Sequence, residues 1–389
     1  MRHSGRGIAQ GALIVSLVAM WNCGDGSRAT VESSPRWRLE EAVRIGSVND
    51  PDQSLTRVVG PVISGDGQVY VGQPMEGVIR VFDASGHALR VVGRKGNGPG
   101  EFGSRLMVLG LQADTLFAVD FAGTIHFFSL DGVPLNSAPF RASLNDGLPL
   151  PTIVTGILPD GSVVATRAMR VGDPLVSLHL ERTGELVDTL FVGAPPSIPM
   201  REGGMLFSIE DPFPSQSLFA VDDRHGRTVV VDRRPAQAAE NPTFRVTVRT
   251  IGGDTIYSRA FPYMRIPVTQ EEADSAIARV ARPLSHVEPN ARKAEELVRR
   301  AVSIPKYHSP VARALFADDG TLWLQLGEQR GVDKRWRAYD ESGKPIGTVT
   351  VPENADVRVI HMGAMWAIVT DALDVPYIVK YQIIKDSEA

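Results

Sequence analysis

Short apolar strands, each introduced by a turn rich in aspartate and glycine, recur along the chain. The six copies read ISGDGQVYVG from Ile63, LQADTLFAVD from Leu111, LPDGSVVAT from Leu158, DDRHGRTVVVD from Asp222, FADDGTLWLQ from Phe316 and HMGAMWAIVTD from His361. A turn of this composition next to an apolar run is typical of a β-hairpin. Internal repeats built from strands predict an architecture in which each unit buries its faces against its neighbours.

Each unit continues beyond its first hairpin. A third stretch of alternating or β-branched residues follows in all six units, as in GVIRVFDASG, and a fourth follows in the first five, as in ALRVVG. The spacing is 48 residues from Asp66 to Asp114 and 46 from Asp114 to Asp160, as expected for a four-stranded blade. The pattern therefore predicts an all-β, six-bladed β-propeller of four-stranded antiparallel blades, occupying residues 36–389.

The sixth unit lacks a fourth strand, since the sequence ends soon after PYIVKYQII. An unused strand pattern, WRLEEAVRIGS from Trp37, stands before the first unit. We expect Leu39–Ile45 to pair with Tyr377–Ile384 as the outer strand of the last blade. This pairing would close the ring and remove the exposed sheet edges that promote aggregation.

Between the fourth and fifth units, residues 268–303 change to the apolar spacing of helices. Thr269 with Glu272 three positions later forms a capping-box pattern, and Asn290 is placed to cap a second helix. The segment is predicted to be a helical hairpin on the face that carries the loops between second and third strands. It either caps one blade or forms a lid over the mouth of the central channel.

Two of the units resemble a known repeat. The run VYVGQPMEGVIRVFDASGHALRVVGRKGNGPGEF, Val69 to Phe102, resembles an NHL-type repeat, and LFAVDFAGTIHFFSLDG, Leu116 to Gly132, repeats its first half. From about Trp37 to Ile384 the arrangement resembles bacterial six-bladed propellers of the NHL/TolB-like group. That resemblance implies an exported protein of the cell envelope, commonly with a lipid anchor.

The first residues have the pattern of an export signal. A basic start precedes the apolar stretch Ile8 to Met20, which is short for a membrane-spanning helix. The single cysteine, Cys23, resembles the lipidation site of a bacterial lipoprotein, although Trp21 and Asn22 depart from that pattern and leave a secreted protein as the alternative. We therefore expect a leader over residues 1–23 and a flexible tether over 24–35.

The charge distribution bears on the kind of ligand. The formal net charge of −4 gives no electrostatic reason to expect nucleic acid. Several cationic side chains fall on loops of the predicted insertion-bearing face, where they would attract an anionic ligand or would simply form a solvated rim. The tentative ligand-binding residues at this face and at the channel mouth are Arg94, Arg105, Arg167, Arg233, His308 and Gln325.

Carboxylates and histidines leave a second chemistry open. Asp120 and Asp232 end second strands, and His308 and His361 lie near inner strands, so they could bind a divalent cation if the fold brought them together. Asp120 also matches the aspartate that orders the following loop in NHL-type repeats. The histidine spacings do not form a zinc motif, and the sequence has no nucleophile elbow.

These observations predict an exported, lipid-anchored propeller that binds a protein, peptide or glycan partner as a monomer, without a catalytic residue or a cofactor. The alternative is a metal-dependent, lactonase-like hydrolase or lyase whose site lies at the channel mouth. Three or more histidine or carboxylate side chains converging on the axis would favour the enzyme.

Overall fold

The computed structural model describes most of the propeller region. The described ranges are 34–142, 152–167, 171–195, 197–202, 204–235, 240–327, 329 and 331–385, without the side chain of residue 286. The predicted leader, most of the predicted tether and the proposed lipidation site Cys23 lie outside these residues.

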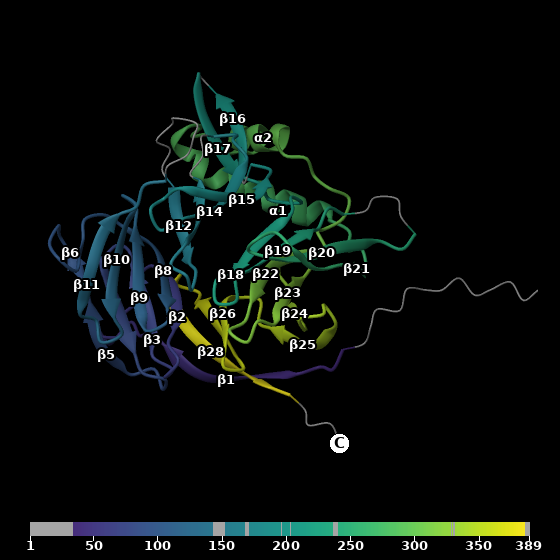
Figure 1. Cartoon of the computed structure of the whole chain (residues 1–389). Coiled ribbons are helices and arrows are strands. Elements are labelled where there is room, and N and C mark those ends of the chain that lie inside the picture. Colours follow the sequence, from purple (N-terminus) through teal and green to yellow (C-terminus); the bar gives the residue numbers. More distant parts are fainter. Residues whose placement is uncertain are drawn as a thin grey trace, which may run out of the picture.

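The described chain forms six four-stranded antiparallel sheets arranged around a centre, a six-bladed β-propeller (Figure 1). Blade 1 contains β2 (Val59–Ile63), β3 (Val69–Gln73), β4 (Val78–Phe82) and β5 (Ala88–Val92). Blade 2 contains β8 (Leu106–Gln112), β9 (Thr115–Asp120), β10 (Thr124–Ser129) and β11 (Pro134–Pro139). Blade 3 contains β12 (Thr152–Ile157), β13 (Val163–Arg167), β14 (Leu175–Leu180) and β15 (Leu186–Gly193).

The second half of the ring follows the same order. Blade 4 contains β18 (Leu218–Asp222), β19 (Arg227–Asp232), β20 (Thr243–Thr250) and β21 (Thr255–Pro262). Blade 5 contains β22 (Val311–Phe316), β23 (Leu322–Leu326), β24 (Lys334–Tyr339) and β25 (Pro345–Val351). Blade 6 contains β26 (Ala355–His361), β27 (Ala364–Thr370), β28 (Pro376–Ile384) and β1 (Arg38–Ile45). The short strands β6 (Arg94–Lys95) and β7 (Glu101–Phe102) pair in the connection from blade 1 to blade 2.

Strand alternation explains how the blades pack. In β20, Phe244, Val246 and Val248 are buried while Arg245 and Arg249 are exposed. Buried apolar side chains of this kind form a shared core between blade 4 and blade 5, and similar clusters join most neighbouring blades. Each blade therefore depends on its neighbours for burial, as the repeat pattern predicts.

The N-terminal strand pairs as the sequence predicts. β1 lies antiparallel to β28, with Leu39 opposite Ile383 and Ile45 opposite Ile378. Just before β1, the backbone N–H of Trp37 donates to the carbonyl of Thr348 in blade 5, at 2.9 Å. The segment therefore joins the outer strand of blade 5 to blade 6 and supplies the fourth strand of blade 6.

The predicted helices are present and end where the capping chemistry places them. α1 spans Gln270–Ala281 behind a complete Thr269–Glu272 capping box, and α2 spans Ala291–Ala301 behind an Asn290 cap. A short 3-10 helix, η1 (Arg282–His286), connects them. In the part of the chain that the structure describes, no helix is long and apolar enough to span a bilayer.

A second insertion, which the sequence analysis missed, accompanies the helices. The strands β16 (Ser197–Glu202) and β17 (Met205–Glu210) form a hairpin between blades 3 and 4. Its buried side chains share one apolar core with Ile277 of α1 and Val298 of α2, both fully buried. We call β16, β17, α1, η1 and α2 the insertion subdomain.

The insertion subdomain sets the two faces of the ring apart. Figure 1 shows β16, β17 and α2 gathered at one end of the molecule, beyond blades 3 and 4. Because neighbouring strands of a blade run antiparallel, the connections from one blade to the next all lie on this side of the ring, and so do the loops that join the second strand of a blade to the third. We call this side the insertion face. Turns between first and second strands lie on the opposite face. The helices pack on the hairpin β16–β17. Neither of the two predicted roles, a cap on one blade or a lid over the channel mouth, included this contact.

Candidate functional site

The centre of the ring contains a cavity of about 430 Å³. It is lined by the inner strands β2, β8, β18, β22 and β26 together with the turns that follow some of them. His361, at the end of β26, and Asp318, just after β22, lie in this lining on the opposite face. His308 is not among the lining residues.

His361 joins neighbouring blades at the end of the channel. Its side chain is buried, and Nδ1 lies 2.8 Å from the carboxylate of Asp318. That carboxylate also accepts the backbone N–H of Met362, at 3.1 Å. Burial lowers the pKa of His361 below its ordinary value, while Asp318 acts in the opposite direction. The imidazole is therefore a neutral cross-link between blades 5 and 6 at neutral pH.

Stability is expected to fall as the pH is lowered from 7.5 to 5.5. The pKa values of His361 and of the buried His126 are both lowered by burial from the ordinary 6.5, so the folded state binds fewer protons than the unfolded chain. Their contributions are complete above about pH 6.5 and are lost as the pH falls through the lowered values. The measurement is the thermal unfolding midpoint of wild type and of the His361→Gln variant across this pH range. The midpoint of the variant should depend on pH less than that of wild type. A wild-type midpoint that stays constant or rises on acidification would contradict this assignment.

His308 lies at the other end of the fold, where the insertion subdomain meets blade 5. It precedes the first residue of β22 by three positions, so one strand length, about 20 Å, separates it from the turn after β22. Its imidazole is buried, with Nε2 3.4 Å from the carboxylate of Glu272 on α1 and its ring 6.4 Å from that of Phe213. His308 and His361, which the sequence analysis placed at one channel mouth, therefore lie on opposite faces.

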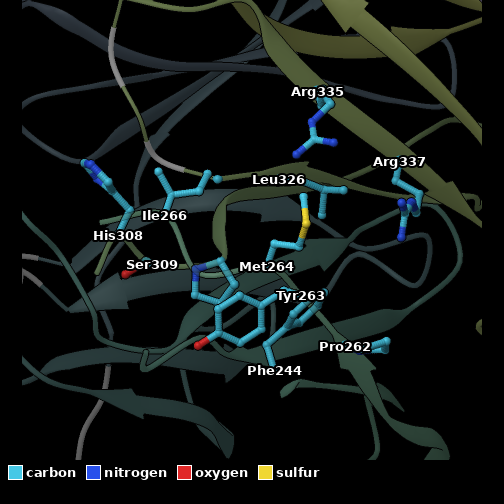
Figure 2. A pocket seen from close by; sticks show the side chains of 12 residues that line it. Phe244, Pro262, Tyr263, Met264, Ile266, His308, Ser309, Leu326, Arg335 and Arg337 are labelled. Carbon is cyan, nitrogen blue, oxygen red and sulfur yellow. The ribbon is translucent and has the colours of Figure 1, made fainter. Parts of the chain in front are cut away.

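Two apolar cavities flank His308. The first, the helix pocket, measures about 160 Å³ and lies against α1; its lining is Pro212, Phe213, Glu272, Ser275, Ala276, Arg279 and His308. The second, the blade pocket, measures about 90 Å³ and lies between blades 4 and 5 (Figure 2). Its lining is Phe244, Pro262, Tyr263, Met264, Ile266, His308, Ser309, Pro310, Leu326, Gly327, Arg335 and Arg337.

The two arginines of the blade pocket occupy positions that strand alternation assigns to the core. Arg335 lies opposite Leu326 and Arg337 opposite Leu324 in the sheet, so all four side chains project from the blade face that packs on blade 4. The intervening Trp336 points to the other face and is fully buried. Among the described residues neither arginine pairs with a carboxylate, and the Nε of Arg337 is buried without a hydrogen-bond partner.

The other candidate ligand residues are spread around the ring. Arg94 is exposed and forms an ion pair with Glu101, with Nε 2.6 Å from the carboxylate. Arg105 is exposed beside Phe121, and Arg167 is half-buried at the end of β13. Gln325 projects from β23 on the face opposite to Leu324 and Leu326. The structure therefore does not gather them into one site.

Arg233 differs from the expectation of a solvated rim. It is 3% exposed, and its guanidinium donates to the carbonyls of Gln216 and Val311 at 2.8 Å each. The bond to Val311 crosses from blade 4 to blade 5, and the bond to Gln216 reaches the segment just before β18. Arg233 therefore stabilises the contact between blades from an inaccessible position.

The four residues of the metal alternative are also separated. Asp120 is buried in blade 2, where it accepts the backbone N–H of Thr124 at 2.9 Å and so orders the following turn. Asp232 pairs with Arg234 in blade 4 at 3.2 Å. With His308 and His361 on opposite faces, no three histidine, cysteine or carboxylate side chains within the described ranges are placed to bind one metal ion.

No family model matches the chain, and no curated protein matches it. Solved structures match it at low sequence identity. A Bacteroides fragilis protein described as exported is 12% identical, with a TM-score of 0.43 over 90% of this chain and 96% of that one. A member of the DUF4221 family from Bacteroides vulgatus is 10% identical, with a TM-score of 0.49 over 91% and 100%. BamB from Moraxella catarrhalis is 12% identical, with a TM-score of 0.36 over 90% and 92%. The six-bladed propeller is defined by this chain's own sheet topology.

Proposed function

We propose that the protein is a non-catalytic binding module that takes an extended peptide segment of a partner protein on its insertion face. The observation that carries the proposal is the pair of apolar pockets on either side of His308, between the ring and the insertion subdomain. Concave apolar surfaces with few polar groups are the usual form of ligand sites. Insertions on a repetitive scaffold are also where binding residues concentrate.

The chemistry of the lining favours a peptide over a glycan. Phe213 and Ala276 in the helix pocket and Phe244, Pro262 and Leu326 in the blade pocket offer apolar contact to side chains. A peptide presents such side chains at regular intervals along its backbone. A glycan would need many more hydroxyl and amide partners than these two linings provide.

The metal-dependent hydrolase or lyase is the weaker candidate. It requires several oxygen or nitrogen ligands around one cation, and the histidines and aspartates considered for it lie at separate places in the described fold. The blade and helix pockets instead offer surface for contact with a ligand. For the location, the sequence of the first 23 residues supports export to the cell envelope, and acylation of Cys23 would anchor the protein there.

A displayed library of random peptides, selected on the purified full-length chain, tests the proposal. We expect an enriched family of peptides whose affinity falls at least ~10-fold in Ser275→Trp, since the exposed Ser275 borders the helix pocket and an indole would fill it. Arg292→Trp adds the same side chain at an exposed position of α2 that borders neither pocket, and should bind as wild type does.

The same preparation tests the alternative. Thermal shifts with Ca²⁺, Mn²⁺ and Zn²⁺ and a panel of lactone substrates would reveal a metal-dependent enzyme. Saturable, cation-dependent turnover, or selected peptides that bind Ser275→Trp unchanged, would overturn the proposed function.

A further inference from the structure

We propose that the blade pocket binds the C-terminal residue of the partner peptide, with an aliphatic side chain in the apolar slot and the terminal carboxylate on Arg335 and Arg337. This inference rests on the proposed function and names the chemistry by which the site recognises its ligand. Three features of the pocket support it: its unpaired charge, its size and its position next to the helix pocket.

The charge of the pocket is not balanced within the described structure. Arg335, which is exposed, and Arg337, which is half-buried, project from the same face of β24 at an interface that is otherwise apolar. Among the described residues, none that lines the pocket is acidic, and the buried Nε of Arg337 has no partner. A half-buried guanidinium whose Nε has no partner and which has no carboxylate beside it disfavours folding, so Arg337, with the exposed Arg335 next to it, points to an anion supplied from outside.

The geometry suits a carboxylate in particular. Figure 2 shows both guanidinium groups on the same side of the pocket, across from Phe244 and Tyr263. Arginine binds carboxylates through two parallel N–H···O bonds, and two arginines provide enough donors for both oxygens of one carboxylate. The apolar wall formed by Phe244, Pro262 and Leu326 then receives the group attached next to that carboxylate.

The size of the pocket limits that group. A volume of about 90 Å³ is smaller than a cavity of ~150 Å³ that accommodates benzene. A valine or leucine side chain is the size that it admits, whereas a long acyl chain is not. Aromatic C-terminal residues are excluded for the same reason.

The neighbouring helix pocket favours a peptide over a free carboxylic acid. His308 forms part of both linings, so both cavities contact the same side chain. A peptide that ends in the blade pocket would pass His308 and place an earlier side chain against Phe213 and Ala276. A single short acid would leave that second cavity unused.

The test uses a pool of fluorescent octapeptides that end in leucine or valine and are random at the other positions, measured on the full-length chain by fluorescence anisotropy. We expect the peptides with a free carboxylate to bind at least ~10-fold more tightly than the same pool with C-terminal amides, because the amide loses the charge-assisted bonds. The Arg337→Met variant should bind the peptides with a free carboxylate more weakly than wild type by the same factor of at least ~10. The charge-matched control is Arg259→Met, an exposed arginine on β21 outside the pocket, which should bind unchanged.

A stability measurement separates ligand binding from a structural role. The Arg335→Met, Arg337→Met double variant should unfold at the same temperature as wild type or at a higher one, because it removes charges that have no partner in the described fold. A lower midpoint would show that the arginines stabilise the fold, and would overturn the inference.

The remaining outcomes are equally decisive. Equal affinity for acid and amide pools, or no binding of either, would overturn the carboxylate assignment, while peptides enriched from the displayed library would leave the proposed function standing. Binding of 4-methylpentanoate alone with the affinity of the peptides would show that the site takes a free acid, and would overturn the assignment to a peptide terminus.

Discussion

A chain that begins at Ser47 is expected to lose cooperative folding. The deletion removes β1, the outer strand of blade 6, together with Trp37, whose indole lies 5.9 Å from the ring of Trp323 in blade 5. It also removes Ile45, a fully buried member of the core between blades 6 and 1. Each large apolar side chain contributes about 1.5–3 kcal/mol, so the loss approaches the ~5–15 kcal/mol by which typical domains are stable.

The measurement is thermal or urea unfolding followed by circular dichroism, with oligomeric state determined by light scattering. The truncated chain exposes the edge of β28, so aggregation is the expected accompanying defect. A chain that begins at Ser34 keeps every described residue and is the control. Adding a peptide of residues 34–46 should restore a cooperative transition, and a scrambled peptide should not. An unchanged midpoint in the truncated chain would refute the role of β1.

Features that depend on neighbouring residues were predictable from the sequence. The strands and their turns follow from period-two apolar patterns bounded by Asp and Gly. The two helices follow from helical spacing and from the caps at Thr269 and Asn290, whose hydrogen bonds reach only three residues along the chain. The pairing of β1 with β28 required one further argument, that an incomplete blade needs a fourth strand.

The hairpin β16–β17 shows why other features were missed. Its buried residues Met200 and Ile209 pack on helices that lie about seventy residues later in the chain, so no local periodicity identifies their partner. The hairpin is also one strand pair without the remaining strands of a blade, and its sequence contains no recurrence of the repeat. Its presence depends on tertiary packing rather than on local pattern.

The candidate site was predicted only in part. His308 lies where the insertion meets the ring, as its position in the sequence indicates, but its separation from His361 follows from strand direction. His308 precedes an inner strand and His361 ends one, and the two ends of an inner strand lie on opposite faces. Arg335 and Arg337 were missed because the alternation of side chains along β24 places both on one face of the strand. It does not show which face of the strand packs against the next blade.

Replacement of Arg227 by methionine is expected to destabilise the fold by about 3–5 kcal/mol, since it removes the guanidinium from a buried carboxylate and leaves the His225 imidazole as its side-chain partner. Asp222 is 3% exposed and lies 2.6 Å from the Arg227 guanidinium. The same guanidinium donates to the carbonyl of Gly320 at 2.8 Å and lies over the ring of Phe316, so it also connects blade 4 to blade 5. Urea unfolding of wild type and variant gives the difference directly.

A double-mutant cycle identifies the cause of that loss. Asp222→Asn removes the buried charge, so Asp222→Asn combined with Arg227→Met should be less destabilised than the sum of the two single variants by about 1–3 kcal/mol. Arg249→Met, an exposed arginine on the adjacent strand β20, should change stability by no more than about 0.5 kcal/mol. Strict additivity in the cycle would show that the destabilisation comes from the bond to Gly320 and from lost packing on Phe316. In that case Arg227 would stabilise the fold through its contacts with blade 5, and the ion pair within blade 4 would contribute little.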